Sequence, residues 1–427
     1  MTLNVFVLGL DEANLEVLQT MPDASSLTFH QLLTREELQE GQISIPDLLT
    51  KARAQLDAFD GSIDAIMTYW DFPGTMMVPI LCRERGLPSA DLSAVVSLEH
   101  KYWSRLIQSR VTSDLPGFGL LDLEASEPRL PDGVNYPAWI KPVQSASSEG
   151  AYYIEGADQL AATLPTAREE VVRLGEPFED ILAMVDLPPE VEKAGGAAYL
   201  AEEAARGRQV TIEGFVFNHE AVMYGLVESV TYPGSASFLR YEYPADVPED
   251  LHQRIAQVSR RVIEASGLNN STFNIEFFYD SDADRLRLLE VNARHSQSHA
   301  TLFHLVDGIT NHHAMASLAL GRRPQVPDGQ GAYAAAATWH LRHFSDGVVR
   351  HVPTEEQVAD FVDRHPGAKV SIDVAPGDRL SDSDFEGSYS YTLAEVITAG
   401  ADTHDLQRQW DTFRSELQFV IDDDEED

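Results

Sequence analysis

The sequence predicts an α/β and α+β protein, with a parallel-sheet unit at the N-terminus and α+β units after it. Three observations support this prediction. The first hundred residues alternate short apolar runs with helical patterns, as parallel sheets do. From about residue 137, β-rich runs follow one another closely, which is typical of antiparallel hairpins. The chain is 427 residues long, more than the about 250–300 residues that one hydrophobic core usually serves, so more than one unit is expected. Hydrophobic residues make up 43% of it, which is enough to form such cores.

The N-terminal unit is predicted from residues 1–112. Residues 5–8 and 63–68 are short buried-strand runs, and a helical pattern begins near Leu15. Residues 76–85 are predicted to be helical, because Gly86 and the proline two positions later stop a helix there. This order of strands and helices favours a small parallel sheet.

The remaining elements are predicted from β-rich runs and helical spacing. Strands are expected at 139–143 and 151–154, an exposed helical insertion at 165–198, and a hairpin at 210–217 and 221–227. An amphipathic helix passes through Leu251 and Val262 and ends at Gly267. The predicted units are 1–112, 113–200, 201–330 and a C-terminal α+β segment at 331–421, and the acidic residues 422–427 are predicted to be a disordered tail.

Composition and charge exclude several classes of partner. The chain has 69 acidic and 31 basic residues and a net charge of -38, which repels nucleic acids and anionic membranes. A single cysteine, Cys82, excludes an internal disulfide. No signal peptide and no run of about 18 apolar residues is found. We expect a cytoplasmic protein with small-molecule partners, and a homo-oligomer is compatible with the sequence.

Two β-rich runs, 272–279 and 285–294, carry the strongest pattern. The polar link between them favours an antiparallel hairpin, and a turn centred on Ala283 places Glu276 opposite Glu290 and Asn274 opposite Asn292. Carboxylate and amide oxygens together are the ligands that Mg²⁺ prefers. The alternative is a solvated strand face with two unpaired acids, and a slip of one residue would separate the pair.

Lysine is scarce in this chain, which draws attention to two of its five lysines. Lys141 lies in a predicted strand, where lysine is disfavoured, and a loop of hydroxyl side chains and a glycine follows it. Backbone N–H groups and a lysine near such a loop suit phosphate oxygens. The alternative is a surface lysine whose stem lies along apolar surface. Lys101, by itself, is an ordinary helical residue.

Taken in order, these motifs resemble the ATP-grasp superfamily, including its carboxylate–amine ligases and carbamoyl-phosphate-synthetase-like members. Lys101 and Lys141 resemble its two phosphate-binding lysines, and the loop to Gly150 resembles its phosphate-covering loop. Residues 202–214 are similar to the adenine hinge, but Gln209 stands where a glutamate usually holds the ribose. Glu276 and the run 290–294 are similar to its metal ligands and adjacent arginine.

The resemblance implies the ATP-grasp architecture: an N-terminal α/β domain, two α+β subdomains that clasp ATP, and a small C-terminal α+β segment. It implies ATP and Mg²⁺ as cofactors, with Mn²⁺ as an alternative. The implied site residues are, for the nucleotide, Lys101, Lys141, Ser145, Ser147, Ser148, Gly150, Glu202, Glu203, Ala205 and Gln209; for the metal, Glu276, Glu290 and Asn292; and for catalysis, Arg294 and His295.

The family's chemistry implies an ADP-forming ligase that activates a small carboxylic acid, such as an amino acid, as an acyl phosphate and joins it to an amine. The alternatives are carboxylation through carboxyl or carbamoyl phosphate, acyl–thiol ligation, and a regulatory protein that binds ATP without turnover. His295 or His299 could line a substrate pocket or act as a general base, the two could bind a zinc ion, or they could be structural alone. Asp71, just past a strand, could cap its loop or bind a substrate amine.

Overall fold

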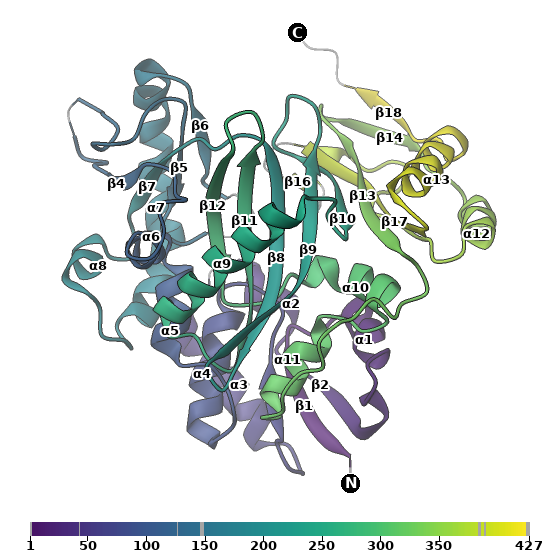
Figure 1. Cartoon of the computed structure of the whole chain (residues 1–427), viewed down its shortest axis with the longest axis horizontal. Coiled ribbons are helices and arrows are strands. Elements are labelled where there is room, and N and C mark those ends of the chain that lie inside the picture. The colour runs from purple at the N-terminus through teal and green to yellow at the C-terminus, as the bar shows by residue number, and fades with distance from the viewer. Residues whose placement is uncertain are drawn as a thin grey trace.

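The computed structural model describes residues 2–41, 43–125, 127–145, 149–382, 386–387 and 390–423. They form a three-stranded, a four-stranded and a nine-stranded sheet, together with a two-stranded one. The N-terminal unit lies at the bottom of Figure 1, the nine-stranded sheet runs through the centre, and the four-stranded sheet stands beside it. No described helix is long and apolar enough to cross a membrane.

The N-terminal unit is the predicted parallel sheet with helices around it. Its strand order is β2-β1-β3, and both pairings are parallel. Its strands and helices are β1 (Leu3–Leu8), α1 (Glu12–Gln19), β2 (Leu27–Leu32), α2 (Arg35–Gln39), α3 (Ile45–Asp57), β3 (Ala65–Met67), α4 (Gly74–Arg85), α5 (Leu92–Glu99) and α6 (Lys101–Gln108). The predicted end of α4 is confirmed, because Gly86 caps it at φ 67°.

The four-stranded sheet has the order β4-β7-β5-β6. Its elements are β4 (Phe118–Leu121), β5 (Ala138–Pro142), β6 (Tyr152–Ile154), α7 (Ala157–Leu182), α8 (Pro189–Ala194) and β7 (Tyr199–Glu203). The prediction of an exposed insertion at 165–198 was wrong for α7, which starts at Ala157 and packs Ala167 and Val171 of that range against this sheet, beside Leu160 and Leu164. These residues recur at helical spacing and form a buried stripe.

The nine-stranded sheet has the order β12-β11-β8-β9-β10-β13-β17-β15, with β16 on β17. It crosses residue 330, because strands from the C-terminal segment extend the sheet that the preceding residues begin. Its strands are β8 (Arg208–Phe217), β9 (Glu220–Thr231), β10 (Phe238–Tyr243), β11 (Ser271–Asp280), β12 (Arg285–Asn292), β13 (Ala335–His343), β15 (Lys369–Ile372), β16 (Glu386–Gly387) and β17 (Ser390–Gly400).

Helices cover this sheet, and the C-terminal residues close one side of it (Figure 1). The remaining elements are α9 (Glu249–Ser266), α10 (Ala300–Asp307), α11 (His312–Ala319), β14 (Gly347–His351), α12 (Glu355–Arg364), α13 (Thr403–Glu416) and β18 (Val420–Asp423). The predicted amphipathic helix is α9, and Gly267 ends it in the left-handed conformation. The tail prediction was wrong for Asp422 and Asp423, which pair with β14 in β18; residues 424–427 lie outside the described range.

Both predicted hairpins are confirmed. The β8–β9 turn places Asn218 and His219 at positive φ, as the tight turns favoured by strand twist require. In the β11–β12 hairpin, Glu276 pairs with Glu290 and Asn274 with Asn292. The register then shifts by one residue after Glu276, a bulge that the uniform pairing predicted from the turn does not contain.

Gly207, between β7 and β8, allows a close backbone approach that we expect no other residue to permit. Its φ is +107°, and a Cβ there would lie 2.1 Å from the Tyr279 carbonyl oxygen. We expect Gly207→Ala to lower the free energy of unfolding by about 2 kcal/mol or more, because strain and overlap add. Thermal unfolding followed by circular dichroism measures this.

Gly234→Ala is the matched control. Gly234 also has positive φ, +76°, but no atom lies within 4 Å of the added carbon. The Gly234→Ala variant should lose only about 1 kcal/mol of unfolding free energy, the cost of holding an alanine in the left-handed conformation. Equal losses of stability in the two variants would contradict the close approach at Gly207.

Candidate active site

The predicted metal ligands Glu276 and Glu290 lie on neighbouring strands, directly opposite each other. Burial and the charge of Glu290 raise the pKa of Glu276 to about 7. Burial would also raise the pKa of Glu290, but the charges of Lys101 and Lys141 outweigh it, so the pKa of Glu290 lies below its ordinary value. The two carboxylates therefore depend on nearby positive charge.

Lys101, at the start of α6, supplies part of that charge. Its Nζ lies 2.9 Å from Glu290 Oε1 and donates to the Ser145 carbonyl oxygen at 2.8 Å. The lysine thus links the N-terminal helices, the start of the predicted phosphate loop and the carboxylate pair. Of that loop, Gly150 lies at positive φ, whereas Ser147 and Ser148 fall outside the described residues.

The oxygen atoms at this pair suit a magnesium ion. Asn292 donates its Nδ2 to Asn274 Oδ1 at 2.9 Å, which leaves the amide oxygen of Asn292 for a cation. Two carboxylates and one amide oxygen are hard donors, but they are too few to enclose Mg²⁺. Among the described residues, no group of three or more His, Cys, Asp or Glu side chains is placed to hold a metal. Phosphate oxygens and water would have to complete the ligand set.

Gln209 supports the carboxylate pair from β8. Its Nε2 donates to Glu276 Oε2 at 2.9 Å. The family's usual glutamate at this position would place a third carboxylate beside the pair, and only an amide can donate a hydrogen bond to Glu276. The departure from the family pattern at Gln209 therefore stabilises an ionised Glu276.

The second predicted lysine, Lys141, pairs with a buried glutamate of the hinge. Its Nζ lies 2.8 Å from Glu202 Oε2, and the other oxygen of Glu202 accepts from Arg105 Nε. Burial would raise the pKa of Glu202, but Arg105 and Lys141 lower it to about 2. Farther along the hinge, Glu203 accepts from Asn135 at 3.3 Å, and Ala205 is half-buried.

Arg105 is a residue of the site that sequence reasoning missed. Its side chain is 2% exposed and also donates to Gln108 Oε1 at 2.6 Å and to the Leu288 and Leu289 carbonyl oxygens at 3.0 and 2.6 Å. It therefore ties α6 to β12 and, through Glu202, to β7. Arg105 lies four residues after Lys101, so both cations share one face of α6. This spacing is the signal in the sequence that could have identified Arg105 as a site residue.

Arg294, the predicted catalytic arginine, follows β12 and pairs with Asp71 of the N-terminal unit. The Arg294 guanidinium donates two hydrogen bonds to the Asp71 carboxylate, one from Nε and one from Nη2. The bond from Nη2 to Oδ2 is 2.6 Å long. Asp71 was predicted to cap its loop or bind an amine, and instead its carboxylate holds this guanidinium. Glu99 accepts from the Ala293 backbone N–H at 3.0 Å, and burial and Asp71 raise the pKa of Glu99 to about 7.

His295 and His299 both lie buried behind the arginine. His295 is fully buried, and its ring nitrogens contact Thr272 Oγ1 at 3.3 Å and His312 Nδ1 at 2.7 Å. His299 Nδ1 lies 2.9 Å from Glu213 Oε1. Neither histidine belongs to a metal-binding group in the described parts of the chain. With both nitrogens engaged, His295 is placed to position its neighbours and is not placed to take a proton from a substrate.

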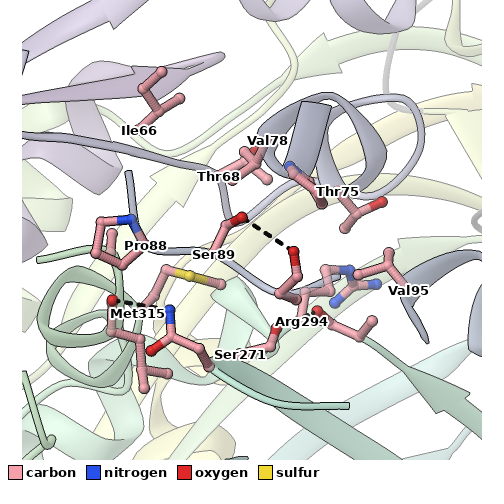
Figure 2. A pocket seen from close by; sticks show the side chains of 16 residues that line it. Ile66, Thr68, Thr75, Val78, Pro88, Ser89, Val95, Ser271, Arg294 and Met315 are labelled. Carbon is pink, nitrogen blue, oxygen red and sulfur yellow. Dashed lines mark hydrogen bonds between the residues drawn. The ribbon is translucent and has the colours of Figure 1, made fainter. Parts of the chain in front are cut away.

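A small cavity adjoins Arg294 where the N-terminal unit meets the start of β11. Figure 2 shows Thr75 and Val95 near Arg294, with Ser271 and Met315 also lining the cavity. Its volume is about 30 Å³, room for about two water molecules. It is therefore too small for a substrate, and the carboxylate pair with its lysines remains the candidate active site.

Comparison with known proteins agrees with this geometry. Residues 134–301 match the family model described as the ATP-grasp domain. This protein has an ATP-grasp domain. The matched range contains Lys141, residues 202–214 and the β11–β12 hairpin, and it begins after Lys101.

Similar proteins extend the likeness beyond the ATP-grasp domain. A D-alanine–D-alanine ligase of Acidiphilium cryptum is 26% identical over 257 residues, 58% of this chain and 70% of that protein. An L-amino acid ligase from Bacillus licheniformis superposes with a TM-score of 0.74 at 14% identity, covering 99% of both chains. A biotin carboxylase from Campylobacter jejuni gives 0.65 at 14% identity, covering 98% of this chain and 92% of that one. The fold is therefore the ATP-grasp fold along the whole chain.

Arg105 offers a test of the buried charge network. We expect Arg105→Met to lower the free energy of unfolding by about 3–5 kcal/mol, because Glu202 loses one partner and the buried Leu288 and half-buried Leu289 carbonyl oxygens lose a donor. Arg254→Met is the matched control, since Arg254 pairs with Asp114 where the arginine is 36% exposed, and such pairs contribute up to about 1 kcal/mol. Urea unfolding of both variants measures the difference, and equal losses would contradict the role of Arg105.

Proposed function

We propose that this protein is an ATP- and Mg²⁺-dependent, ADP-forming carboxylate–amine ligase. The observation that carries the proposal is the facing pair Glu276 and Glu290, surrounded by Lys101, Lys141 and Arg294. Such a site suits phosphoryl transfer, which relies on positioning and charge and needs no protein nucleophile. Cys82, the single cysteine, is fully buried, and its burial raises the pKa of the thiol to about 12.

The side chains divide the work as follows. Lys101 and Lys141 bind and neutralise phosphate oxygens, and Glu276, Glu290 and Asn292 hold the metal. These three side chains would hold Mg²⁺, which would supply positive charge to the phosphate groups of ATP. An oxygen of the substrate carboxylate bonds to the γ-phosphorus while the bond to the β–γ bridging oxygen breaks, so ADP leaves and an acyl phosphate forms.

The second step joins the amine. Its nitrogen bonds to the acyl carbon, the bond from that carbon to the phosphate oxygen breaks, and the proton that the nitrogen loses passes to the departing phosphate. Arg294, oriented by Asp71, stabilises the negative charge that develops first on the phosphoryl oxygens and then on the oxygen of the tetrahedral intermediate. The products are an amide, ADP and inorganic phosphate.

The named relatives support an amino acid as the carboxylate substrate. One is called a D-alanine–D-alanine ligase and another an L-amino acid ligase. We therefore propose an amino acid as the activated acid and a second amine, free or within an amino acid, as the acceptor. Mn²⁺ in place of Mg²⁺, a cytoplasmic location and a homo-oligomer stay predictions.

Phosphate release with a panel of substrates tests this function. The protein is incubated with Mg-ATP and pairs of amino acids, other small acids and amines, and ADP, phosphate and the new amide are measured. We expect phosphate release that requires an acid and an amine together. Release with bicarbonate or with a thiol in place of the amine would favour carboxylation or thioester formation. ATP binding with no turnover for any pair would favour a regulatory protein.

Glu290→Gln tests the metal ligands. It keeps the size of the side chain but removes one anionic ligand, so we expect turnover to fall by about 10²-fold or more, the loss typical when a group that stabilises transition-state charge is removed. Asp282→Asn, on the exposed turn of the same hairpin, should keep wild-type turnover. Near-normal activity of Glu290→Gln over a range of Mg²⁺ concentrations would contradict the assignment.

A further inference from the structure

A continuous chain of hydrogen bonds joins the N-terminal unit to the residue after Arg294. Asn14 Nδ2 donates to Asp11 Oδ2 at 2.8 Å, and Asn14 Oδ1 lies 2.9 Å from His312 Nε2. His312 Nδ1 lies 2.7 Å from His295 Nε2, and His295 Nδ1 lies 3.3 Å from Thr272 Oγ1. The chain therefore links the start of α1, helix α11, the segment after β12 and strand β11.

The partners fix which ring nitrogens carry protons. Because the amide nitrogen of Asn14 is used by Asp11, its oxygen faces His312, and His312 Nε2 must be the donor. Burial lowers the pKa of His312 to about 3, so its ring is neutral and Nδ1 is an acceptor. His295 Nε2 must then donate to it, and burial lowers the pKa of His295 as well. Both histidines are thus neutral Nε2–H tautomers.

The far end of the chain closes on the backbone beside Arg294. His295 Nδ1 accepts from the Thr272 hydroxyl, and the same hydroxyl oxygen accepts from the His295 backbone N–H at 3.0 Å. Asn274 Nδ2 donates to the Arg294 carbonyl oxygen at 2.9 Å. The peptide that joins Arg294 to His295 is therefore held on both sides by β11.

The N-terminal unit makes a second contact with this region, through two residues of one loop. The ring of Tyr69 stacks on His312 with centroids 5.0 Å apart and planes 22° apart. Two residues later, Asp71 pairs with the Arg294 guanidinium. One loop of the N-terminal unit therefore supports both the arginine head group and the histidine that holds the adjacent backbone.

We propose that His312 and Asn14 are positioning residues for Arg294, acting through the neutral chain Asn14–His312–His295–Thr272. This inference rests on the proposed function, in which Arg294 stabilises the reacting phosphoryl and acyl groups. All the hydrogen bonds of this chain run in one direction, from Thr272 through His295 and His312 to Asn14, because only in this tautomeric state does each donor meet an acceptor. Displacing a catalytic group by about 1 Å can cost about 10²-fold in rate, so a buried chain that contacts no substrate can still control turnover.

Nuclear magnetic resonance of the whole protein labelled with ¹⁵N-histidine and ¹⁵N-arginine tests the chain without turnover. We expect His295 and His312 to be neutral with protonated Nε2, and we expect the Arg294 Nε–H signal to be protected from solvent exchange. In His312→Phe, that arginine signal should shift or lose protection. An Nδ1–H tautomer at either histidine, or an unchanged Arg294 signal in His312→Phe, would overturn the inference.

Kinetics with matched variants give the second readout. His312→Phe should reduce kcat by about 10- to 10²-fold and change the KM for ATP by less than about twofold, because the chain touches no predicted nucleotide ligand. His312→Gln, which keeps one donor and one acceptor, should recover much of that loss. Asn14→Leu combined with His312→Phe should lose no more than His312→Phe alone, since both break one chain.

His313→Phe is the control on the same helix, because His313 is also buried but bonds to Ser317 and to the Gln325 backbone N–H. It should cost stability without the fall in kcat. An equal fall in kcat for His313→Phe, or no recovery in His312→Gln, would mean that His312 contributes only to packing, and it would overturn the proposal. Absence of ligase activity in the wild-type protein, with the expected tautomers and Arg294 shift, would count against the proposed function and leave the positioning chain supported.

Discussion

The repulsion between two facing carboxylates is the constraint on which this site depends. Glu276 and Glu290 stand opposite each other on one hairpin, in surroundings where charges interact more strongly than in water. Such a pair is stable only when cations reach it, and the chain brings them from separate units: Lys101 from α6 and Lys141 from β5. Packing of the units against each other therefore brings the lysines to the carboxylate pair and neutralises its charge.

A second layer of charge holds those cations and the arginine in place. Glu202 fixes Lys141 and is itself held by Arg105, while Asp71 orients Arg294. Breaking any one of these pairs leaves a buried or half-buried charge without its partner, which costs more than losing an exposed ion pair. The acidic surface, with a net charge of -38 for the chain, repels anions at long range, and salt screens that repulsion. The buried cations act at contact distance, where screening is weak.

The N-terminal unit is more than a neighbour of the ATP-grasp domain. Asp71, Tyr69 and Asn14 lie close to the strand ends of its parallel sheet, where open α/β sheets place functional groups. Each contacts Arg294 or the histidine chain beside it. The chemistry that we propose thus depends on a unit that lies outside the range matched by the domain model.

Local sequence determined the hairpins, the end of α4 and the pairing of Glu276 with Glu290, because strand alternation and turn residues set these features within a few tens of residues. The order of the motifs also indicated the family and its lysines. Only the tertiary structure decided that Arg294 meets Asp71, 223 residues away, and that His312 meets Asn14, 298 residues away. Likewise, Arg105 joined Glu202, Gln209 turned to Glu276, and α7 packed on its sheet. Such contacts depend on how whole units pack against each other, and no periodicity along the chain encodes the distance between side chains that packing brings together.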